Sequence, residues 1–279
     1  MQKLLKKNLP LLYGAYFNGL SYFSKSLAAK KAFDTFCKVR KGKVLPHQAS
    51  FLDQAKKEKE FVEGHEIQSY HWEGPGATVL LVHGWESNSF RWRNLISYLR
   101  ENEFNILAFD APAHGYSSGE YLHVPLYSEC MLHMLKKHRP SHVVAHSVGG
   151  MTTLYTQYRY PENSVEKIVT IGAPSEFHEI MEHFRQLLNL NPRMMHALDE
   201  FVMDRFGFRV REFSASAFAR TIDRKGLIFH DKLDTVAPFH ASEQLHSQWH
   251  GSILVSTEGL GHSMHQDIVN KRIVDFLIS

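Results

Sequence analysis

Ser147 stands in the string AHSVGG, residues 145–150, between an apolar run and an amphipathic segment. At such a strand-to-helix junction a serine sits on a sharp turn with its hydroxyl exposed, and the small residues Ala145 and Gly149 suit that turn. The first N–H groups of the following helix favour negative charge beside the hydroxyl. The spacing therefore predicts a nucleophilic serine, with a helix-capping serine as the alternative.

A serine hydroxyl is a poor nucleophile at neutral pH, so an imidazole must take its proton. His262, in GLGHSMHQD (259–267), follows the last expected strand and should lie at the carboxyl end of the sheet. Ligands bind at that end in open α/β folds. His265 is the second candidate, but it lies at the expected helix start, so we expect His262 to be the base.

A carboxylate must hold this imidazole in the correct tautomer. GLIFHDKLDTVAPF supplies Asp231 and Asp234 after a buried strand. We favour Asp234, because it stands where a side chain reaches across the strand ends, and we expect a structural role for Asp231. Glu176, after another strand, is a third candidate.

Acyl transfer also needs two N–H donors for the oxyanion that develops. We assign the backbone N–H of Val148, directly after the serine, and that of Trp85 in HGWESN. Gly84 allows a close backbone approach there, and His83 is expected to brace the loop. The candidate substrate-binding side chains are Trp85, His146, Met181, Phe184 and Met195, although the Met- and Phe-rich stripe equally fits the buried face of a helical cap.

The rest of the chain predicts an α/β fold, with apolar strands alternating with amphipathic helices. Residues 61–74 predict an antiparallel hairpin or edge strands. Further strands are expected at 77–84, 105–112, 142–147, 165–174, 225–234 and 251–259, with helices at 89–101, 128–139 and 149–160 and from 267 onward. We divide the chain into a helical extension, 1–60, and a main domain, 61–279, with a helical cap at about 175–222.

From about residue 60 onward, the chain resembles the α/β-hydrolase family. The shared motifs, in family order, are HGW (83–85), DAPAHGYSSG (110–119), AHSVGG (145–150), HDKLDTVAP (230–238) and GLGH (259–262). The resemblance implies an eight-stranded, mostly parallel sheet with a cap after the sixth strand. It also implies a Ser147–Asp234–His262 triad without metal or organic cofactor. Ala113 and Ala145 replace glycines of many members, and residues 1–60 match no family motif.

This resemblance implies a carboxylesterase-like serine hydrolase. We expect it to cleave a carboxylic ester or thioester, with an apolar acyl or alcohol part, through an acyl-enzyme. Dehalogenases and epoxide hydrolases use an aspartate nucleophile, so Ser147 argues against both. Amide and carbon–carbon bond hydrolysis stay open. The alternatives are a triad-bearing small-molecule receptor with little turnover and a membrane-associated lipase or acyltransferase.

The amino-acid composition limits the kinds of binding partner that we expect. Lys and Arg exceed Asp and Glu by 32 to 29 without a long block of one sign, so no nucleic-acid partner is expected. The 19 His residues show no HExxH spacing, and no metal site is expected. Cys37 and Cys130 predict no disulfide framework, which favours a reducing, cytoplasmic location.

Residues 8–24 are uncharged and lie between lysines. The run is short and interrupted by Pro10 and Gly14, so a membrane-spanning helix is not expected. A secretory leader is an alternative that would make the protein exported. Residues 25–60 predict an amphipathic helix with Phe33, Phe36 and Val39 on one side. We favour a packed helical pair over peripheral membrane contact through residues 8–29.

Overall fold

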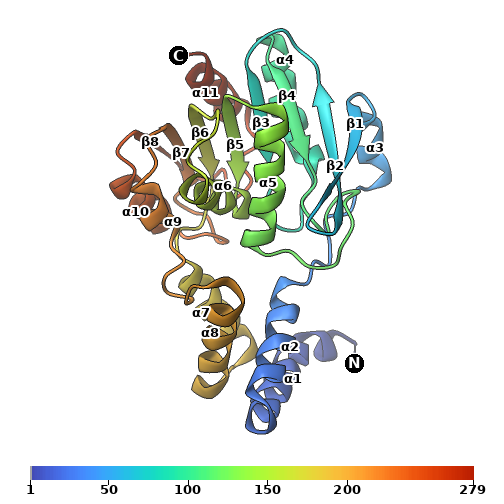
Figure 1. Cartoon of the computed structure of the whole chain (residues 1–279), viewed down its shortest axis with the longest axis vertical. Coiled ribbons are helices and arrows are strands. Elements are labelled where there is room, and N and C mark those ends of the chain that lie inside the picture. Colours follow the sequence, from blue (N-terminus) through green and yellow to red (C-terminus); the bar gives the residue numbers. More distant parts are fainter. Residues whose placement is uncertain (1) are drawn as a thin grey trace. The chain divides into compact units, whose positions relative to one another are not determined.

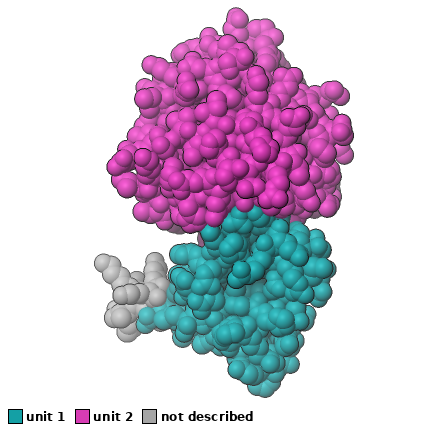
Figure 2. All heavy atoms as spheres, turned by 90° about the vertical axis from the view of Figure 1, so that its left-hand side faces the viewer, with its two compact units in different colours: residues 1–38, 176–214 teal, residues 39–175, 215–279 magenta. Residues whose placement is uncertain are grey.

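The computed structural model describes residues 2–279, and side chains from residue 8 onward. The chain forms two compact units (Figure 2). Unit 1 comprises residues 1–38 and 176–214, and unit 2 comprises residues 39–175 and 215–279. Segments that the sequence analysis assigned to a separate extension and cap thus form one unit.

Unit 2 contains a single eight-stranded sheet flanked by helices (Figure 1). Its strands are β1 (Lys56–Val62), β2 (His65–Trp72), β3 (Thr78–Val82), β4 (Asn105–Phe109), β5 (His142–His146), β6 (Lys167–Ile171), β7 (Lys225–Asp231) and β8 (Ser252–Thr257). Its helices are α3 (Pro46–Leu52), the 3₁₀ helix η1 (Ser89–Trp92), α4 (Arg93–Glu101), α5 (Val124–His138), α6 (Val148–Arg159), α9 (Ala215–Ala219), α10 (His240–Gln248) and α11 (Asp267–Ile278).

The strand order is β1-β2-β4-β3-β5-β6-β7-β8. β1 and β2 pair antiparallel with each other, and β2 pairs antiparallel with β4. The other neighbours are parallel, which confirms the predicted mostly parallel sheet. The predicted hairpin is present, but β1 begins at Lys56 rather than at residue 61 and the turn lies at Glu63 and Gly64. Both faces of β3 to β6 are buried in the protein, and their sequences are therefore mostly apolar.

Helices cover both faces of this sheet (Figure 1). α4 and α11 pack together on one face, with η1 and α3 nearby, and contribute side chains such as Trp92, Leu99 and Ile273 to a buried core. α5 and α6 pack together on the other face, and α9 contacts both α6 and α10. With both faces covered, the carboxyl ends of the parallel strands are where loops can present polar groups.

Unit 1 consists of α1 (Gln2–Phe23), α2 (Lys25–Cys37), α7 (Phe177–Leu188) and α8 (Pro192–Phe206). Apolar side chains from these helices form its core, among them Phe17, Phe33, Phe184 and Leu198. Ser24 caps α2, since its hydroxyl accepts a hydrogen bond from the N–H of Leu27 at 3.3 Å. The first residues therefore pack with α7 and α8 in this unit, and packing of the helical pair on the main domain stays a prediction.

The helix expected over residues 25–60 is shorter than predicted. α2 ends at Cys37, and the N–H of Val39 donates instead to the carbonyl of Glu120 at 3.0 Å. A separate helix, α3, begins at Pro46, whose missing N–H costs nothing in the first turn. The helical spacing of apolar residues continues past Cys37, but the backbone leaves the helix where Val39 hydrogen-bonds to Glu120.

Candidate active site

Ser147 joins β5 to α6 in a strained backbone conformation. Its φ and ψ are 53° and −125°, a region costly for a residue with a side chain, at about 1–3 kcal/mol. Its N–H donates to the carbonyl of Ile171 at 2.8 Å, which holds the turn against β6. The hydroxyl makes no capping hydrogen bond to α6. Capping therefore does not explain the serine at this position.

Glycines let neighbouring backbone approach this turn. A Cβ on Gly84 would lie 2.9 Å from the Cβ of Ser147 and 2.8 Å from Nδ1 of His146. A Cβ on Gly149 would lie 2.5 Å from the carbonyl oxygens of Val82 and His83. Contacts this short are excluded, so both glycines are needed for the loop after β3 to lie against the Ser147 turn.

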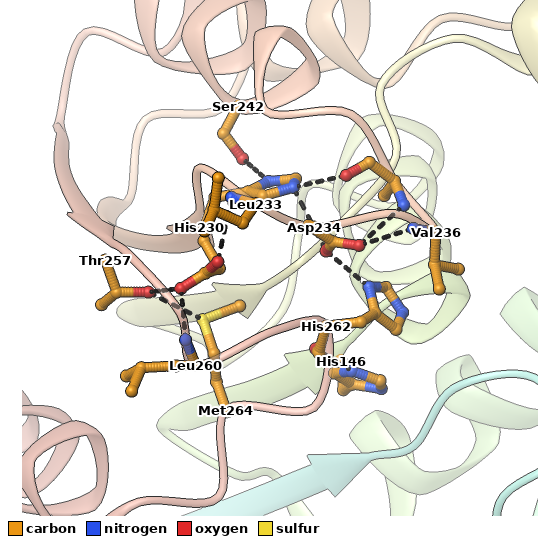
Figure 3. Close-up of polar contacts among 12 residues, drawn as sticks. His146, His230, Leu233, Asp234, Val236, Ser242, Thr257, Leu260, His262 and Met264 are labelled. Carbon is orange, nitrogen blue, oxygen red and sulfur yellow. Dashed lines mark hydrogen bonds and ion pairs between the residues drawn. The ribbon is translucent and has the colours of Figure 1, made fainter.

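His262 and Asp234 form a hydrogen-bonded pair beyond the ends of β7 and β8 (Figure 3). Nδ1 of His262 lies 2.7 Å from Oδ2 of Asp234. The Asp234 side chain is fully buried, whereas that of His262 is 17% exposed. The other oxygen, Oδ1, accepts hydrogen bonds from the N–H groups of Val236 at 2.7 Å and Ala237 at 3.1 Å. The carboxylate is therefore held in one orientation, with one oxygen directed at the imidazole.

Gly172 lies against this pair. Its φ is +57°, and a Cβ there would lie 3.1 Å from Nδ1 of His262 and 3.4 Å from Oδ2 of Asp234. The residue follows β6, and its N–H donates to the carbonyl of Phe229 at 2.9 Å. Gly172 was not among the residues predicted from the sequence, although an isolated glycine at the end of a buried strand was the available signal.

The other candidate residues make different contacts. Oδ2 of Asp231 accepts hydrogen bonds from the hydroxyl of Thr257 and the N–H of Leu260, both at 2.8 Å. Burial raises the pKa of Asp231, but these hydrogen bonds outweigh it and leave the pKa lowered. Glu176 lies in unit 1 and accepts a hydrogen bond from the Ser214 hydroxyl at 2.8 Å. Asp234, by contrast, contacts His262 directly.

A second buried histidine, His230 on β7, also faces Asp234 (Figure 3). Its Nε2 lies 2.9 Å from the carbonyl oxygen of Ala237 and 3.4 Å from Oδ2 of Asp234. Because a carbonyl only accepts, Nε2 must carry the proton, and Nδ1 accepts from the hydroxyl of Ser242. Burial lowers the pKa of His230 and favours this neutral form. Sequence reasoning missed His230.

Two further residues hold the loop that carries His262. Nε2 of His146 donates to the carbonyl of His262 at 3.0 Å, and the two rings lie 4.7 Å apart between centroids. Arg91 donates to the carbonyl of Ser263 at 3.0 Å. Burial lowers the pKa of His146 well below its usual value and that of Arg91 to about 9. The expected substrate contact of His146 stays a prediction, because one ring nitrogen is engaged with this loop.

Two neutral histidines shape the loop after β3. His83 contacts the carbonyl of Gly84 at 2.7 Å through Nδ1 and accepts the N–H of Ala111 at 2.9 Å through Nε2. His114 accepts the N–H of Glu86 at 2.9 Å. Burial lowers their pKa values to about 4 and about 3. The backbone on both sides of Trp85 is thereby anchored.

The N–H groups of Trp85 and Val148 are the expected oxyanion donors. Within the described part of the chain, neither donates a hydrogen bond to another residue. The Trp85 ring packs edge-on to His114, with 5.9 Å between centroids. Both donors are thus unused, as an anion site requires.

The candidate pocket residues of the cap belong to unit 1. Met181 and Phe184 are buried in the core of unit 1, at 1% and 7% exposure, and Met195 packs partly buried against it. Their packing matches the buried-face interpretation, and a pocket-lining role stays a prediction. His265 lies just before α11, and burial lowers its pKa to about 4.

No group of three or more His, Cys, Asp or Glu side chains able to hold a metal ion occurs in the described residues. No described helix is long and apolar enough to cross a membrane. Cys37 and Cys130 are both buried and free.

Comparison with known proteins agrees with this architecture. The α/β hydrolase fold family model matches residues 77–202. Pimeloyl-[acyl-carrier protein] methyl ester esterase of Vibrio vulnificus is 27% identical over 149 residues, which is 52% of this chain and 55% of the esterase. The matched region thus spans about half the length of that relative. The uncharacterized hydrolase YugF of Bacillus subtilis is 21% identical and covers 77% of this chain and 96% of its own.

Solved structures share the same fold. Est1E of Butyrivibrio proteoclasticus, with ferulic acid bound, superposes with a TM-score of 0.67 at 17% identity, covering 79% of this chain and 98% of its own. The esterase EaEST of Exiguobacterium antarcticum superposes with a TM-score of 0.64 at 18% identity, covering 80% and 100%. The sheet order and these similarities show that the chain has the α/β-hydrolase fold.

Proposed function

We propose that the protein is a serine hydrolase that cleaves a carboxylic ester, with Ser147 as nucleophile, His262 as base and Asp234 as the orienting acid. The observation that carries the proposal is the 2.7 Å contact between His262 and the buried carboxylate of Asp234. The strained Ser147 turn supports it, because strain of this kind is retained where the side chain has a function.

In the proposed reaction, Oγ of Ser147 attacks the ester carbonyl carbon and its proton passes to Nε2 of His262. Asp234 stabilises the imidazolium that forms. The N–H groups of Val148 and Trp85 stabilise the oxyanion. Collapse releases the alcohol, which takes the proton from His262, and leaves the acyl group on Ser147. Water then attacks the acyl-enzyme while His262 takes its proton, and collapse returns that proton to Oγ of Ser147 and releases the carboxylic acid.

An ester is our choice of substrate because of the relatives. The Vibrio vulnificus relative is named as a methyl ester esterase, so the bond that it cleaves is a carboxylic ester. A thioester reacts through the same acyl-enzyme and is the second substrate class to assay. We also propose that the acyl or alcohol part of the substrate is apolar. The protein should then prefer longer p-nitrophenyl esters to the acetate.

The test compares the wild type with Ser147→Ala on p-nitrophenyl esters of graded chain length. Loss of hydrolysis to the uncatalysed rate is expected for the variant. A fluorophosphonate probe should label the wild type, and labelling should disappear in Ser147→Ala and in His262→Ala. Equal hydrolysis by wild type and Ser147→Ala would overturn the proposal. A single acyl burst without turnover would instead identify a ligand-retaining receptor.

The buried free thiols of Cys37 and Cys130 support a reducing, cytoplasmic location as part of this proposal. Burial raises the pKa of the Cys130 thiol to about 12, so it is protonated and unreactive at neutral pH. Fractionation of cells that express the full chain tests this location.

A further inference from the structure

Helix α1 presents an apolar stripe to solvent. Five large side chains at helical spacing contribute to it: Leu9, Leu12, Tyr13, Tyr16 and Phe23, which are 48%, 58%, 43%, 50% and 90% exposed. Residues spaced by three, four and seven lie on one face of a helix. Exposed apolar side chains scattered singly are ordinary, but a contiguous stripe marks a surface that contacts another apolar medium.

A neighbouring face of α1 packs within unit 1, whereas Leu11 and Tyr22, outside both faces, are also exposed. Phe17 and Ser21 are buried, and a Cβ on Gly14 would lie 1.6 Å from the carbonyl oxygen of Leu188. Asn18 adds two hydrogen bonds, to the carbonyl of Asn189 and from the N–H of Asn191. These contacts prevent α1 from rotating its stripe into the core of the unit. The stripe is therefore a stable feature of the folded unit.

The region that carries the stripe is basic. Residues 1–33 contain six lysines and no Asp or Glu, and one of these lysines, Lys30, pairs with Asp34. Unit 1 as a whole has twelve Lys and Arg against eight Asp and Glu, a net charge of +4. Unit 2 has twenty against twenty-one, a net charge of −1. The net positive charge of the protein is thus concentrated in the unit that carries the stripe.

We propose that unit 1 binds the surface of an anionic lipid bilayer, with α1 lying in the interface and its stripe in contact with the acyl region. Leu and Phe supply apolar area, and Tyr13 and Tyr16 have the amphipathic rings suited to the headgroup boundary. Each nearby lysine adds about 1 kcal/mol of attraction to an anionic surface. This inference does not depend on the proposed chemistry.

The charge distinguishes this occupant from a second copy of the chain. Pairing two stripes would bring together two segments that each contain six lysines and no acidic residue within residues 1–33. Like charges in contact repel, whereas anionic headgroups neutralise them. A dimer through α1 is therefore disfavoured.

The experiment is co-sedimentation of the full-length protein with vesicles of phosphatidylcholine alone or with about 30% phosphatidylglycerol. We expect binding to the anionic vesicles and release when the ionic strength is raised to about 0.5 M. The variant Leu12→Ser/Tyr16→Ser/Phe23→Ser should partition at least about tenfold less. The matched control is Phe61→Ser/Ile268→Ser, which removes side chains that are 77% and 71% exposed in unit 2 and should bind like the wild type.

Hydrogen exchange on the wild type provides a measurement that needs no variant. Anionic vesicles should slow exchange of the α1 amides and leave those of α5 unchanged. The proposal is overturned if the wild type does not bind anionic vesicles, or if the stripe variant binds them as well as the control variant. Self-association that the stripe variant abolishes, without vesicle binding, would assign the stripe to a second copy instead.

Discussion

Nε2 of His230 lies 3.4 Å from Oδ2 of Asp234, the same carboxylate oxygen that His262 contacts at 2.7 Å. One buried carboxylate thus faces two imidazoles, one fully buried and one partly exposed. The buried imidazole is tied at both nitrogens, to Ala237 and to Ser242. We therefore expect His230 to help position Asp234, while His262 is the imidazole proposed for proton transfer.

Removing the His230 N–H should impair catalysis more than substrate binding. We expect His230→Leu to lower kcat by up to about tenfold with little change in KM, because the variant loses the hydrogen bond to Ala237 that holds the loop around Asp234, and a neutral hydrogen bond is worth about 0.5–1.5 kcal/mol. His230→Gln retains an N–H donor and should recover part of the loss. Steady-state kinetics on a p-nitrophenyl ester measure both. An unchanged kcat in a folded His230→Leu would contradict the positioning role.

The two aspartates of the β7 loop should behave differently. Asp234→Asn should lower kcat by about 10⁴-fold with little change in stability, because the imidazole loses its orienting charge. Asp231→Asn should mainly lower the free energy of unfolding, since it weakens the hydrogen bonds to Thr257 and Leu260. Fluorophosphonate labelling and urea unfolding distinguish the two effects. Labelling that survives in Asp234→Asn but is lost in Glu176→Gln would move the acid to Glu176.

Gly172→Ala should damage the site through steric contact. The new Cβ would lie 3.1 Å from Nδ1 of His262 and 3.4 Å from Oδ2 of Asp234, so the imidazole must be displaced and its contact with Asp234 disturbed. The matched control is Gly64→Ala, where φ is +78° and an added Cβ would meet no heavy atom within 4 Å beyond its chain neighbours. Both variants share the backbone strain, of about 1 kcal/mol or more, but only Gly172→Ala should lose most of its activity. Equal activities would show that the site tolerates the methyl group.

Stability should fall in mild acid because several buried histidines are neutral in the folded state. Burial lowers the pKa of His83 to about 4, that of His114 to about 3 and that of His265 to about 4. In the unfolded chain these groups titrate near 6.5, so the unfolded state binds more protons below that pH. The free energy of unfolding therefore decreases as pH falls from about 6.5 towards 4. At the fully buried His83 the loss is on the order of 3 kcal/mol.

Urea unfolding at a series of pH values measures this dependence. The lowered pKa of Glu58, about 2, adds a separate loss that begins only below about pH 4.5, so the histidine effect is isolated above it. His265→Asn removes one of the titrating groups and should reduce the slope between pH 6.5 and 4.5. A free energy of unfolding that stays constant over this interval would contradict the assignment of neutral buried histidines.

Sequence patterns that depend on neighbouring residues predicted much of the fold. Continuous apolar runs located the parallel strands, and the string AHSVGG placed Ser147 at a strand-to-helix junction, where the structure has it. Such patterns are informative because side-chain periodicity and turn chemistry act over a few residues. The same patterns predicted one helix over residues 25–60, because local spacing contains no information on the hydrogen bond from Val39 to the distant Glu120.

By itself, then, the sequence determined the succession of strands along the chain, the candidate serine and histidine, and a preference for Asp234 over two other carboxylates. The tertiary structure decided which carboxylate contacts His262, and it brought His230 and Gly172 beside that pair. It also grouped residues 1–38 with 176–214. The physical reason is that burial and hydrogen bonding between distant segments depend on how the strands and helices pack, which no local periodicity encodes.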